Sequence, residues 1–532
     1  MFFTVIKDSS GWLAGVHPVV LVLLSSIIAV GVLCLGFRLW AFTIKPAFRP
    51  YEPRELPYWI PVLGHAVQYV KSGQDVITRA RKYFGDTRAP FALTLGGEKM
   101  FFLTDPKQVA DFHKNTTSLA FDKIAQELST TFGVSQKTLQ TTYRRPNSEE
   151  VDVPAKIMQI QNPRNKSLAE LNNDFWKQQL VPGPLYYKLQ DECLQYLDNS
   201  LKPESIAHNY KGPTDEKGTT VSLLRLMQDV LMDAALRAFF GDKMMELEPN
   251  LIRDFIDFDE DNWKLWYKWP DAKEMFAAKS KLSKSVQRWL NTPEEERPGA
   301  AFIVETFEKT QRAMGTPIED LANILVLIIF VANTNTYKVC FWALAYILND
   351  PDLLHKVQQE SAAAFQADGT LSTKQLMDSS PWIAAVFHEA LRWCSASTSL
   401  RLVTAPTIIG GKELPVGSRV AVPARQTLFM PEAFGDDADV FNPERFIRDE
   451  KLTKSPSYKP FGGGTTYCPG RFIARQECSV VIAILLKNFN TDVLGEGKAP
   501  ELDLTKPTTG LVTPKDGQDV IVRLSPKSEI LP

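Results

Sequence analysis

Hydrophobic positions along the chain fall into blocks that predict three kinds of element. The first block is a run of twenty residues, 18–37, without a charged side chain. About 20 apolar residues in a row can cross the hydrocarbon core of a bilayer as a helix. Apolar positions then recur at helical spacing over most of residues 167–395, whereas residues 91–104 and 402–425 hold β-prone runs around glycines. The pattern predicts a mainly α-helical fold with a small β part and one N-terminal transmembrane helix.

The first 64 residues are predicted to tether a single larger domain. The apolar run is long for a signal peptide and no cleavage site with small residues follows it, and its position at the N-terminus argues against a buried core helix. The next segment contains five prolines and predicts a stiff hinge, because proline resists helix continuation. We expect a short luminal N-terminus, a transmembrane anchor, a proline-rich hinge and one domain at residues 1–17, 18–38, 39–64 and 65–532, respectively.

The charge balance narrows the class of protein and orients the anchor. The net charge is −2, from 60 basic and 62 acidic residues, which gives no reason to expect nucleic acid as a partner. The six cysteines form no Cys-x-x-Cys pair, so neither a disulfide framework nor a zinc site is indicated. By the positive-inside rule, basic residues after the apolar run place the bulk of the chain in the cytosol; they are Arg38, Lys45, Arg49 and Arg54.

The most specific chemical signal is the segment FGGGTTYCPGRFIA at residues 461–474. Its cysteine, Cys468, stands in a glycine-rich loop that leads into an apolar helix. Glycines let the backbone approach the sulfur, and the helix N-terminus adds partial positive charge that favours a thiolate. Such a thiolate is a ligand of haem iron. The alternative interpretation is a buried structural cysteine beside a loop.

Two further segments precede this loop in the sequence. Glu389 and Arg392 are three residues apart on a predicted helix and therefore share a face. The segment FNPERF, residues 441–446, follows and carries Arg445. An ordinary surface ion pair is the alternative interpretation of the first spacing.

The predicted helix over residues 321–348 is apolar except for a polar patch, Asn333-Thr334-Asn335-Thr336. Polar groups inside an apolar helix need partners or water, and threonine there bends the helix by bonding to the preceding turn. A polar contact between two helices is one interpretation, and a functional site is the other.

Taken together, these segments resemble the cytochrome P-450 family. Phe461, Gly464, Cys468 and Gly470 fit its haem-binding pattern, Phe-x-x-Gly-x-x-x-Cys-x-Gly. The resemblance implies the P-450 fold, with a long central helix over a haem b whose axial ligand is Cys468. It also implies that three charged residues form a buried network that holds the thiolate loop: Glu389, Arg392 and Arg445.

The polar patch resembles the family element Ala/Gly-Gly-x-Asp/Glu-Thr, which lines the oxygen pocket and relays protons. Thr336 keeps the alcohol, but Asn333 replaces the glycine and Asn335 replaces the acid. An amide does not titrate, so we expect proton delivery by Thr336 and ordered water, with Asn335 as an orienting group. The following Phe341-Trp342 is similar to the branch of sterol 7α-hydroxylases and prostacyclin synthase, and the chain resembles fungal-type members in specialised metabolism.

Other positions depart from the family pattern. Thr466 stands where a basic partner of a haem propionate is common, and Trp176 lacks the arginine that follows it in the family. Arg401 is our candidate propionate partner, with a simple surface arginine as the alternative. The resemblance implies that four segments form the substrate pocket: 112–135, 328–336, 396–402 and 508–512. Residues 136–166 are predicted to form an exposed loop or a mobile substrate-side segment.

The resemblance implies a membrane-anchored haem-thiolate monooxygenase that oxidises a sterol- or terpenoid-like lipophile for secondary-metabolite biosynthesis. Electrons are expected from NADPH through NADPH–cytochrome P-450 reductase, at the endoplasmic reticulum membrane, with a single-pass anchor and a cytosolic catalytic domain at residues 65–532. Asn335 leaves a second reading open, a haem-thiolate isomerase or dehydratase that acts on a peroxide or pre-oxidised lipid without external electrons. A non-catalytic haem carrier is a third.

Overall fold

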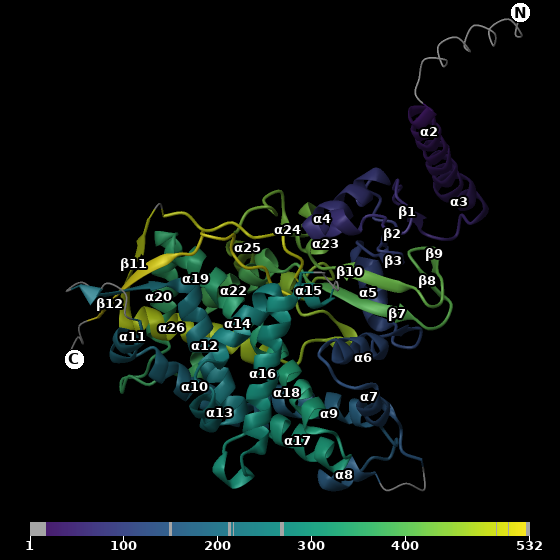
Figure 1. Cartoon of the computed structure of the whole chain (residues 1–532). Helices are drawn as coiled ribbons and strands as arrows, with labels where there is room; N and C mark the ends of the chain where they lie inside the picture. Colours follow the sequence, from purple (N-terminus) through teal and green to yellow (C-terminus); the bar gives the residue numbers. More distant parts are fainter. Residues whose placement is uncertain are drawn as a thin grey trace, which may run out of the picture.

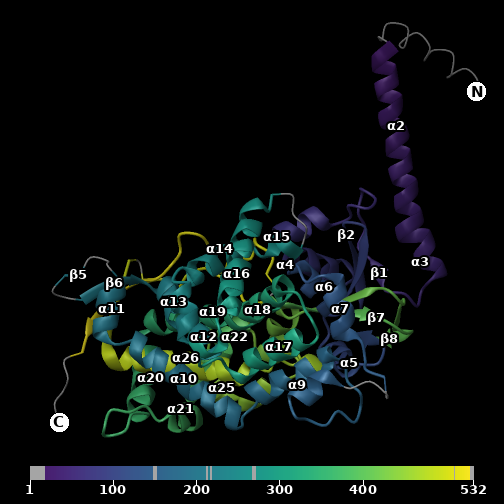
Figure 2. The ribbon, with the colours of Figure 1, turned by 60° about the horizontal axis from the view of Figure 1, so that its bottom comes forward.

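The computed structural model describes residues 18–147, 152–210, 214–215, 218–266, 271–495, 497–508 and 510–527. The predicted luminal segment, residues 1–17, lies outside this range. A helical rod, formed by α2 (Pro18–Leu39), the π-helical turn η1 (Trp40–Ile44) and α3 (Lys45–Phe48), projects from the body of the molecule (Figures 1 and 2). The rod is apolar and its side chains are unburied, as a membrane helix requires. It continues to Phe48, so the irregular part of the predicted hinge is shorter than expected.

The body is mainly α-helical, as predicted (Figure 1). Its helices are α4 (Ala66–Tyr83), α5 (Pro106–Lys114), α6 (Asp122–Thr131), α7 (Gln136–Tyr143), α8 (Val153–Ile157), α9 (Leu168–Leu180), α10 (Pro184–Ser200), α11 (Pro203–Asn209), α12 (Leu223–Phe240), α13 (Asp242–Leu247), α14 (Leu251–Asp261), α15 (Trp263–Trp266), α16 (Lys273–Asn291), η2 (Glu294–Glu296), α17 (Phe302–Ala313), α18 (Ile318–Asn333), α19 (Thr336–Leu348), α20 (Pro351–Ala363), α21 (Thr373–Ser379), α22 (Pro381–Cys394), α23 (Arg425–Leu428), α24 (Pro431–Phe434), α25 (Glu444–Arg448), η3 (Glu450–Lys454), η4 (Gly464–Thr466) and α26 (Arg471–Asn488).

The strands form small sheets at opposite sides of the body (Figure 1). On the side of the rod, a six-stranded sheet has the order β1-β2-β3-β10-β7-β4: Arg54–Glu55, Phe91–Leu95, Glu98–Phe102, Arg419–Pro423, Thr398–Val403 and Leu119–Ala120. Beside it lies the two-stranded pair β8 (Thr407–Ile409) and β9 (Lys412–Leu414). The distant four-stranded sheet has the order β11-β12-β6-β5: Phe489–Leu494, Ile521–Pro526, Gly218–Ser222 and Thr214–Asp215.

The hairpin predicted at residues 91–104 is confirmed. β2 and β3 pair antiparallel with Phe91 opposite Phe102 and Leu95 opposite Glu98. The connecting residues, Gly96 and Gly97, have φ of 62° and 89°, a backbone that glycine adopts without strain.

The long apolar helix predicted at residues 321–348 forms as two helices, α18 and α19, separated at Thr334 and Asn335. Most of its apolar surface is buried, so its hydrophobicity is that of a core helix. Trp342 on α19 is fully buried, and its indole N–H donates to the Val512 carbonyl at 2.7 Å.

The prediction of an exposed loop at residues 136–166 is wrong in part, because this stretch contains α7 and α8. Ser135 caps α7 by accepting from the Thr138 amide. The hydroxyls of both residues also donate to the carboxylate of Asp320 on α18, at 2.5 Å each. Leu139 is buried beneath them. The partner lies some 180 residues away in sequence, which local composition does not reveal.

Candidate functional site

Cys468 lies between η4 and the start of α26, partly buried. Its backbone N–H donates to the Phe461 carbonyl at 3.1 Å, which closes the loop. Burial raises the pKa of the Cys468 thiol, while the Gly470 and Arg471 amides and the Arg471 charge oppose that shift. The helix N-terminus thus directs donors at the sulfur, as a thiolate ligand requires.

The glycines of this loop are fixed by close contact with the end of α5. A Cβ on Gly464, whose φ is +62°, would lie 2.1 Å from the backbone oxygen of His113. A Cβ on Gly463 would lie 3.0 Å from the imidazole of the same residue. A larger residue at 464 would therefore displace backbone, and the loop keeps its shape only with glycine there.

Arg401 on β7 is buried, not a surface arginine. Its guanidinium donates to the Thr466 hydroxyl at 3.1 Å and to the Asn115 carbonyl at 3.0 Å. The structure thus brings together Arg401 and Thr466, the two positions that the sequence singled out for an anionic group.

His113 lies beside them, and the sequence pattern did not predict it. Its side chain is buried, and its Nδ1 has no hydrogen-bond partner among the described residues. Burial and the Arg401 charge lower the pKa of His113 to about 4. The only sequence signal was its place at the edge of the predicted pocket segment 112–135.

Glu389, Arg392 and Arg445 form a buried ion-pair network. Arg392 makes a bidentate contact with Glu389, at 2.7 Å for each hydrogen bond, and Nε of Arg445 lies 3.2 Å from the same carboxylate. Arg392 also donates to the carbonyls of Leu428 and Ala438, at 3.0 and 2.8 Å. The network therefore fastens the segment before the cysteine loop to α22, and the surface-pair interpretation does not apply.

At the break between α18 and α19, Thr336 is partly buried, and its hydroxyl has no hydrogen-bond partner among the described residues. Asn335 is tied elsewhere: its Oδ1 accepts from the Leu511 amide at 2.9 Å. A Cβ on Gly510 would lie only 2.0 Å from that oxygen. The side-chain oxygen that we expected to orient water therefore fixes the 510–512 turn, and the Asn335 Nδ2 is left for other partners.

A pocket of about 300 Å³ lies between α6, α7, α9, α17 and α18. Phe121, Leu128, Ile328 and Val331 supply apolar walls from two of the four predicted segments. The helix α7 belongs to residues 136–166, for which a substrate-side segment was one of the two predictions. The helices α9 and α17 were not predicted to contribute, because they meet α18 only in the folded chain. Trp176, which lacks the family's arginine partner, lines this pocket.

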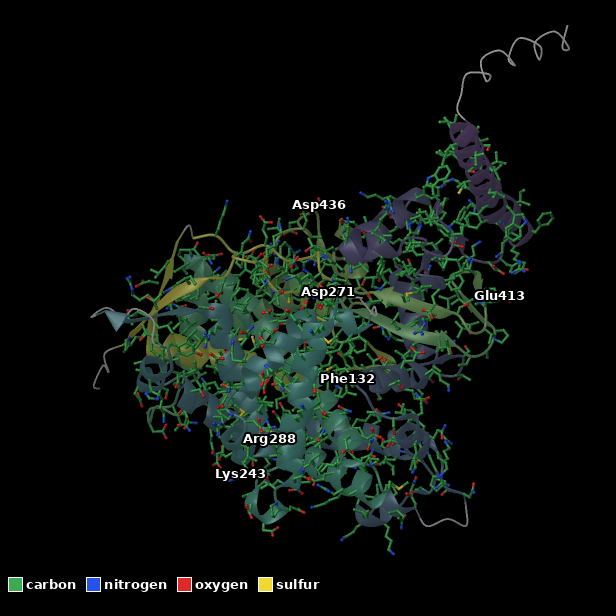
Figure 3. All side chains as sticks on the ribbon, viewed as in Figure 1. Phe132, Lys243, Asp271, Arg288, Glu413 and Asp436 are labelled. Atoms are coloured by element: carbon green, nitrogen blue, oxygen red, sulfur yellow. The ribbon has the colours of Figure 1, made fainter. Side chains whose placement is uncertain are left out.

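The aromatic ring of Phe132, labelled inside the body in Figure 3, lies next to this region. It packs against Phe330 on α18 and Phe258 on α14, with ring centroids 5.4 and 5.8 Å apart. The cluster joins the end of α6 to α14 and to α18, the helix that precedes the break.

The residues around Cys468 fit a haem held through a thiolate. One sulfur stands at a helix N-terminus, in a loop whose glycines admit no side chain at position 464. Beside the loop lie the buried guanidinium of Arg401 and the unpartnered imidazole nitrogen of His113. Both groups bind carboxylates such as those of a porphyrin. Fold and site therefore define a haem-thiolate protein.

Comparison with known proteins gives the family. The family model Cytochrome P450 matches residues 210–522. The chain belongs to the cytochrome P450 family, which confirms the predicted family, fold class and enzyme class, a P450 monooxygenase. A haem iron with a thiolate ligand is implied by that membership.

Curated relatives cover most of the chain at low identity. The cytochrome P450 monooxygenase poxD of Penicillium oxalicum is 24% identical over 480 residues, which are 86% of this chain and 92% of that protein. The human 7-alpha-hydroxycholest-4-en-3-one 12-alpha-hydroxylase is 24% identical over 90% of this chain and 94% of its own. Mouse cytochrome P450 7B1 is 24% identical over 84% and 86%. Fungal monooxygenases and the predicted sterol hydroxylase branch are thus both represented.

Proposed function

We propose that this P450 monooxygenase hydroxylates or further oxidises a sterol- or terpenoid-like lipophile in fungal-type secondary metabolism. The observation that carries the proposal is the pocket of about 300 Å³, which combines apolar walls with polar and charged side chains and reaches Val331, one turn before the Thr336 break. A few polar groups in such walls orient an apolar ligand. Relatives named as sterol hydroxylases, fungal monooxygenases and a beta-amyrin 11-oxidase of Glycyrrhiza uralensis support the substrate class.

On the thiolate side, Cys468 is the proposed iron ligand, with Phe461, Gly464 and Gly470 shaping its loop. When bound, the haem supplies the reductive activation of dioxygen that lets one oxygen atom enter a C–H bond. The Gly470 and Arg471 amides stabilise the sulfur's negative charge. Arg401 and His113 would hold the propionates, and the buried Glu389–Arg392–Arg445 network keeps the loop in place.

On the oxygen side, the Thr336 hydroxyl would hold and pass protons at its Oγ. Asn335 does not titrate, so the protons must arrive through water. The Asn335 Oδ1 accepts from the Leu511 amide and so positions the turn beside the break. The Asn335 Nδ2 can orient a water. A Thr336→Ala enzyme should consume NADPH but release more hydrogen peroxide; unchanged coupling of NADPH to product would make the alcohol a purely structural group.

The electrons would come from NADPH through NADPH–cytochrome P-450 reductase. The apolar, unburied rod would anchor the protein in the endoplasmic reticulum membrane as a single pass. The basic residues that follow the anchor favour a cytosolic catalytic domain.

The test is turnover by the full chain in microsomes with the reductase. NADPH and isotopically labelled dioxygen are supplied with 7α-hydroxycholest-4-en-3-one or β-amyrin, compounds named for relatives. We expect products that carry one labelled oxygen atom and require both NADPH and reductase. Absence of labelled product from a broad panel of sterols and terpenoids would reject the substrate class.

The second candidate is a haem-thiolate isomerase or dehydratase of pre-oxidised lipids. The observation in its favour is that Asn335 replaces the acid and spends its Oδ1 on the Leu511 amide. The discriminating experiment leaves out NADPH and reductase and supplies a lipid hydroperoxide. Turnover under these conditions, without labelled oxygen from the gas phase, would favour this candidate over the monooxygenase.

A further inference from the structure

A buried carboxylate from α14 accepts hydrogen bonds from the helix break and from the first turn of α19. The Asp259 side chain is 1% exposed. It accepts from the Thr334 hydroxyl, from the Tyr337 hydroxyl at 2.8 Å and from Asn262 at 3.1 Å, and the Lys338 ammonium lies 2.9 Å away. Every lone pair of the carboxylate that faces the break is therefore engaged.

Three of these donors, Thr334, Tyr337 and Lys338, surround Thr336 in sequence and belong to the break or to the first turn of α19. A lysine in the first turn opposes the helix macrodipole, and an anion at that end is favourable. Asp259 supplies the anion from another helix. The place at which α19 begins, and hence the position of Thr336, depends on a residue of α14.

α14 is also linked to the pocket. Phe258, the neighbour of Asp259, packs against Phe132 and Phe330. Phe330 precedes Val331, which lines the pocket. A ligand that moves this aromatic cluster would act on the helix that holds the carboxylate.

We propose that Asp259 and Lys338 are positioning residues for oxygen activation: their ion pair ties α14 to the helix break and holds the Thr336 hydroxyl in place. This inference rests on the proposed proton-handling role of Thr336. The family element has a titrating acid at position 335, and this chain has the amide of Asn335 there. The buried charges next to the break are those of Asp259 and Lys338. The pair acts through Thr336 and does not touch the substrate.

The test uses the full-length haem-loaded enzyme with reductase. Asp259→Asn breaks the pair and leaves Lys338 unpaired. The double variant Asp259→Leu/Lys338→Met removes both charges, so neither side chain is left as a buried unpaired charge, although the Thr334 and Tyr337 hydroxyls lose their acceptor. The matched control is Glu308→Gln on α17, which breaks the buried pair of Glu308 with Arg297, whose side chains are 9% and 5% exposed.

Two readouts are compared. The first is hydrogen peroxide released per NADPH consumed, with 7α-hydroxycholest-4-en-3-one as the added probe and also without it. The second is hydrogen–deuterium exchange of the peptide over residues 334–342, which needs no turnover. We expect both Asp259 variants to raise the peroxide yield, to lower product per NADPH roughly tenfold where the probe is oxidised, and to exchange faster at 334–342. Glu308→Gln should leave both readouts unchanged.

The inference would be overturned if the double variant formed as much product per NADPH as the wild type and exchanged deuterium at 334–342 at the wild-type rate. The pair would then be structural only. Equal uncoupling by Glu308→Gln would also overturn it, because any loss of stability would then suffice. Rescue by Asp259→Glu supports it. Faster exchange in the Asp259 variants, together with wild-type coupling in Thr336→Ala, would retain the tether but reject the proposed role of Thr336.

Discussion

The cysteine loop and the helix break differ in the kind of contact that holds them. Around Cys468 the loop is constrained largely by backbone: Gly464 meets a carbonyl oxygen, and Arg392 donates to carbonyls of the adjoining segment. At the break, side chains make the structure, and Asn335 and Asp259 bond to partners on other segments. A residue that is packed against backbone cannot be replaced by a larger one, whereas the partners of a side-chain contact can change to neighbouring groups. This explains why the glycines of the loop match the family pattern, whereas the side-chain position Thr466 in the loop and two positions at the break depart from it.

The largest expected effect is at the sulfur. Cys468→Ser should abolish product formation and the long-wavelength Soret band of the reduced carbonyl complex, because a serine does not supply the thiolate. Reduced-carbonyl difference spectroscopy measures this. Cys394→Ala, which alters another buried cysteine, should keep the band. Survival of the band in Cys468→Ser would place the iron ligand elsewhere.

The network behind the loop comes next. Glu389→Gln leaves Arg392 buried without a counter-charge, which typically costs about 3–5 kcal/mol, while Arg445 keeps its contact with Asp437 at 3.0 Å. Chemical denaturation and haem retention should both show the loss. Glu444→Gln breaks an exposed pair with Arg448 and should change stability by less than about 1 kcal/mol. Similar losses from the two variants would refute the network's role.

Gly464→Ala tests the backbone constraint directly. Its Cβ would lie 2.1 Å from the His113 backbone oxygen at a φ of +62°, so we expect a loss of about 2–5 kcal/mol from strain and overpacking. The matched control is Gly411→Ala, with φ of +71° and open space around the Cβ. It should lose only the strain, about 1 kcal/mol. Equal losses would remove the close contact as the cause.

Acid should weaken the thiolate side through His388, whose Nδ1 lies 3.0 Å from the Tyr458 hydroxyl. Burial, with the Arg475 charge, lowers the pKa of His388 from 6.5 to about 4. On acidification, His388 therefore takes up a proton in the unfolded chain before it does so in the folded chain. The free energy of unfolding decreases by at most about 3 kcal/mol as pH falls from about 6.5 to about 4. His388→Gln should flatten the stability–pH curve there. If the stability–pH curve of the variant ran parallel to that of the wild type, His388 would not be the group that causes the loss of stability in acid.

The smallest effect should appear at the break. Gly510→Ala places a Cβ 2.0 Å from the Asn335 Oδ1, but a side chain can rotate away where a backbone carbonyl cannot. We expect loss of the Asn335–Leu511 hydrogen bond, about 0.5–1.5 kcal/mol, with more peroxide per NADPH. Thermal unfolding and peroxide assays measure both. A loss as large as that of Gly464→Ala would show that the two regions do not differ as argued.

Local patterns were enough to predict several parts of the molecule. The glycine-rich loop, the Glu389–Arg392 spacing and the interrupted apolar helix are short-range features, and each appears in the structure where it was expected. The predicted loop at 136–166 was wrong in part, because α7 is stabilised by Asp320 from a distant helix. His113 was missed for the same reason, since its contact with Gly464 lies some 350 residues away in sequence.

By itself the sequence determined the anchor-like apolar run, the mainly helical fold, the family and the cysteine of the loop, because these depend on periodicity and on residues at short spacing. Only the tertiary structure decided which groups meet at the break: Asp259 from α14, Lys338 from α19 and the Leu511 amide from the C-terminal turn. Buried polar groups must find partners wherever the chain brings them. Those partners come from separate elements, so their pairing is a property of the packed fold.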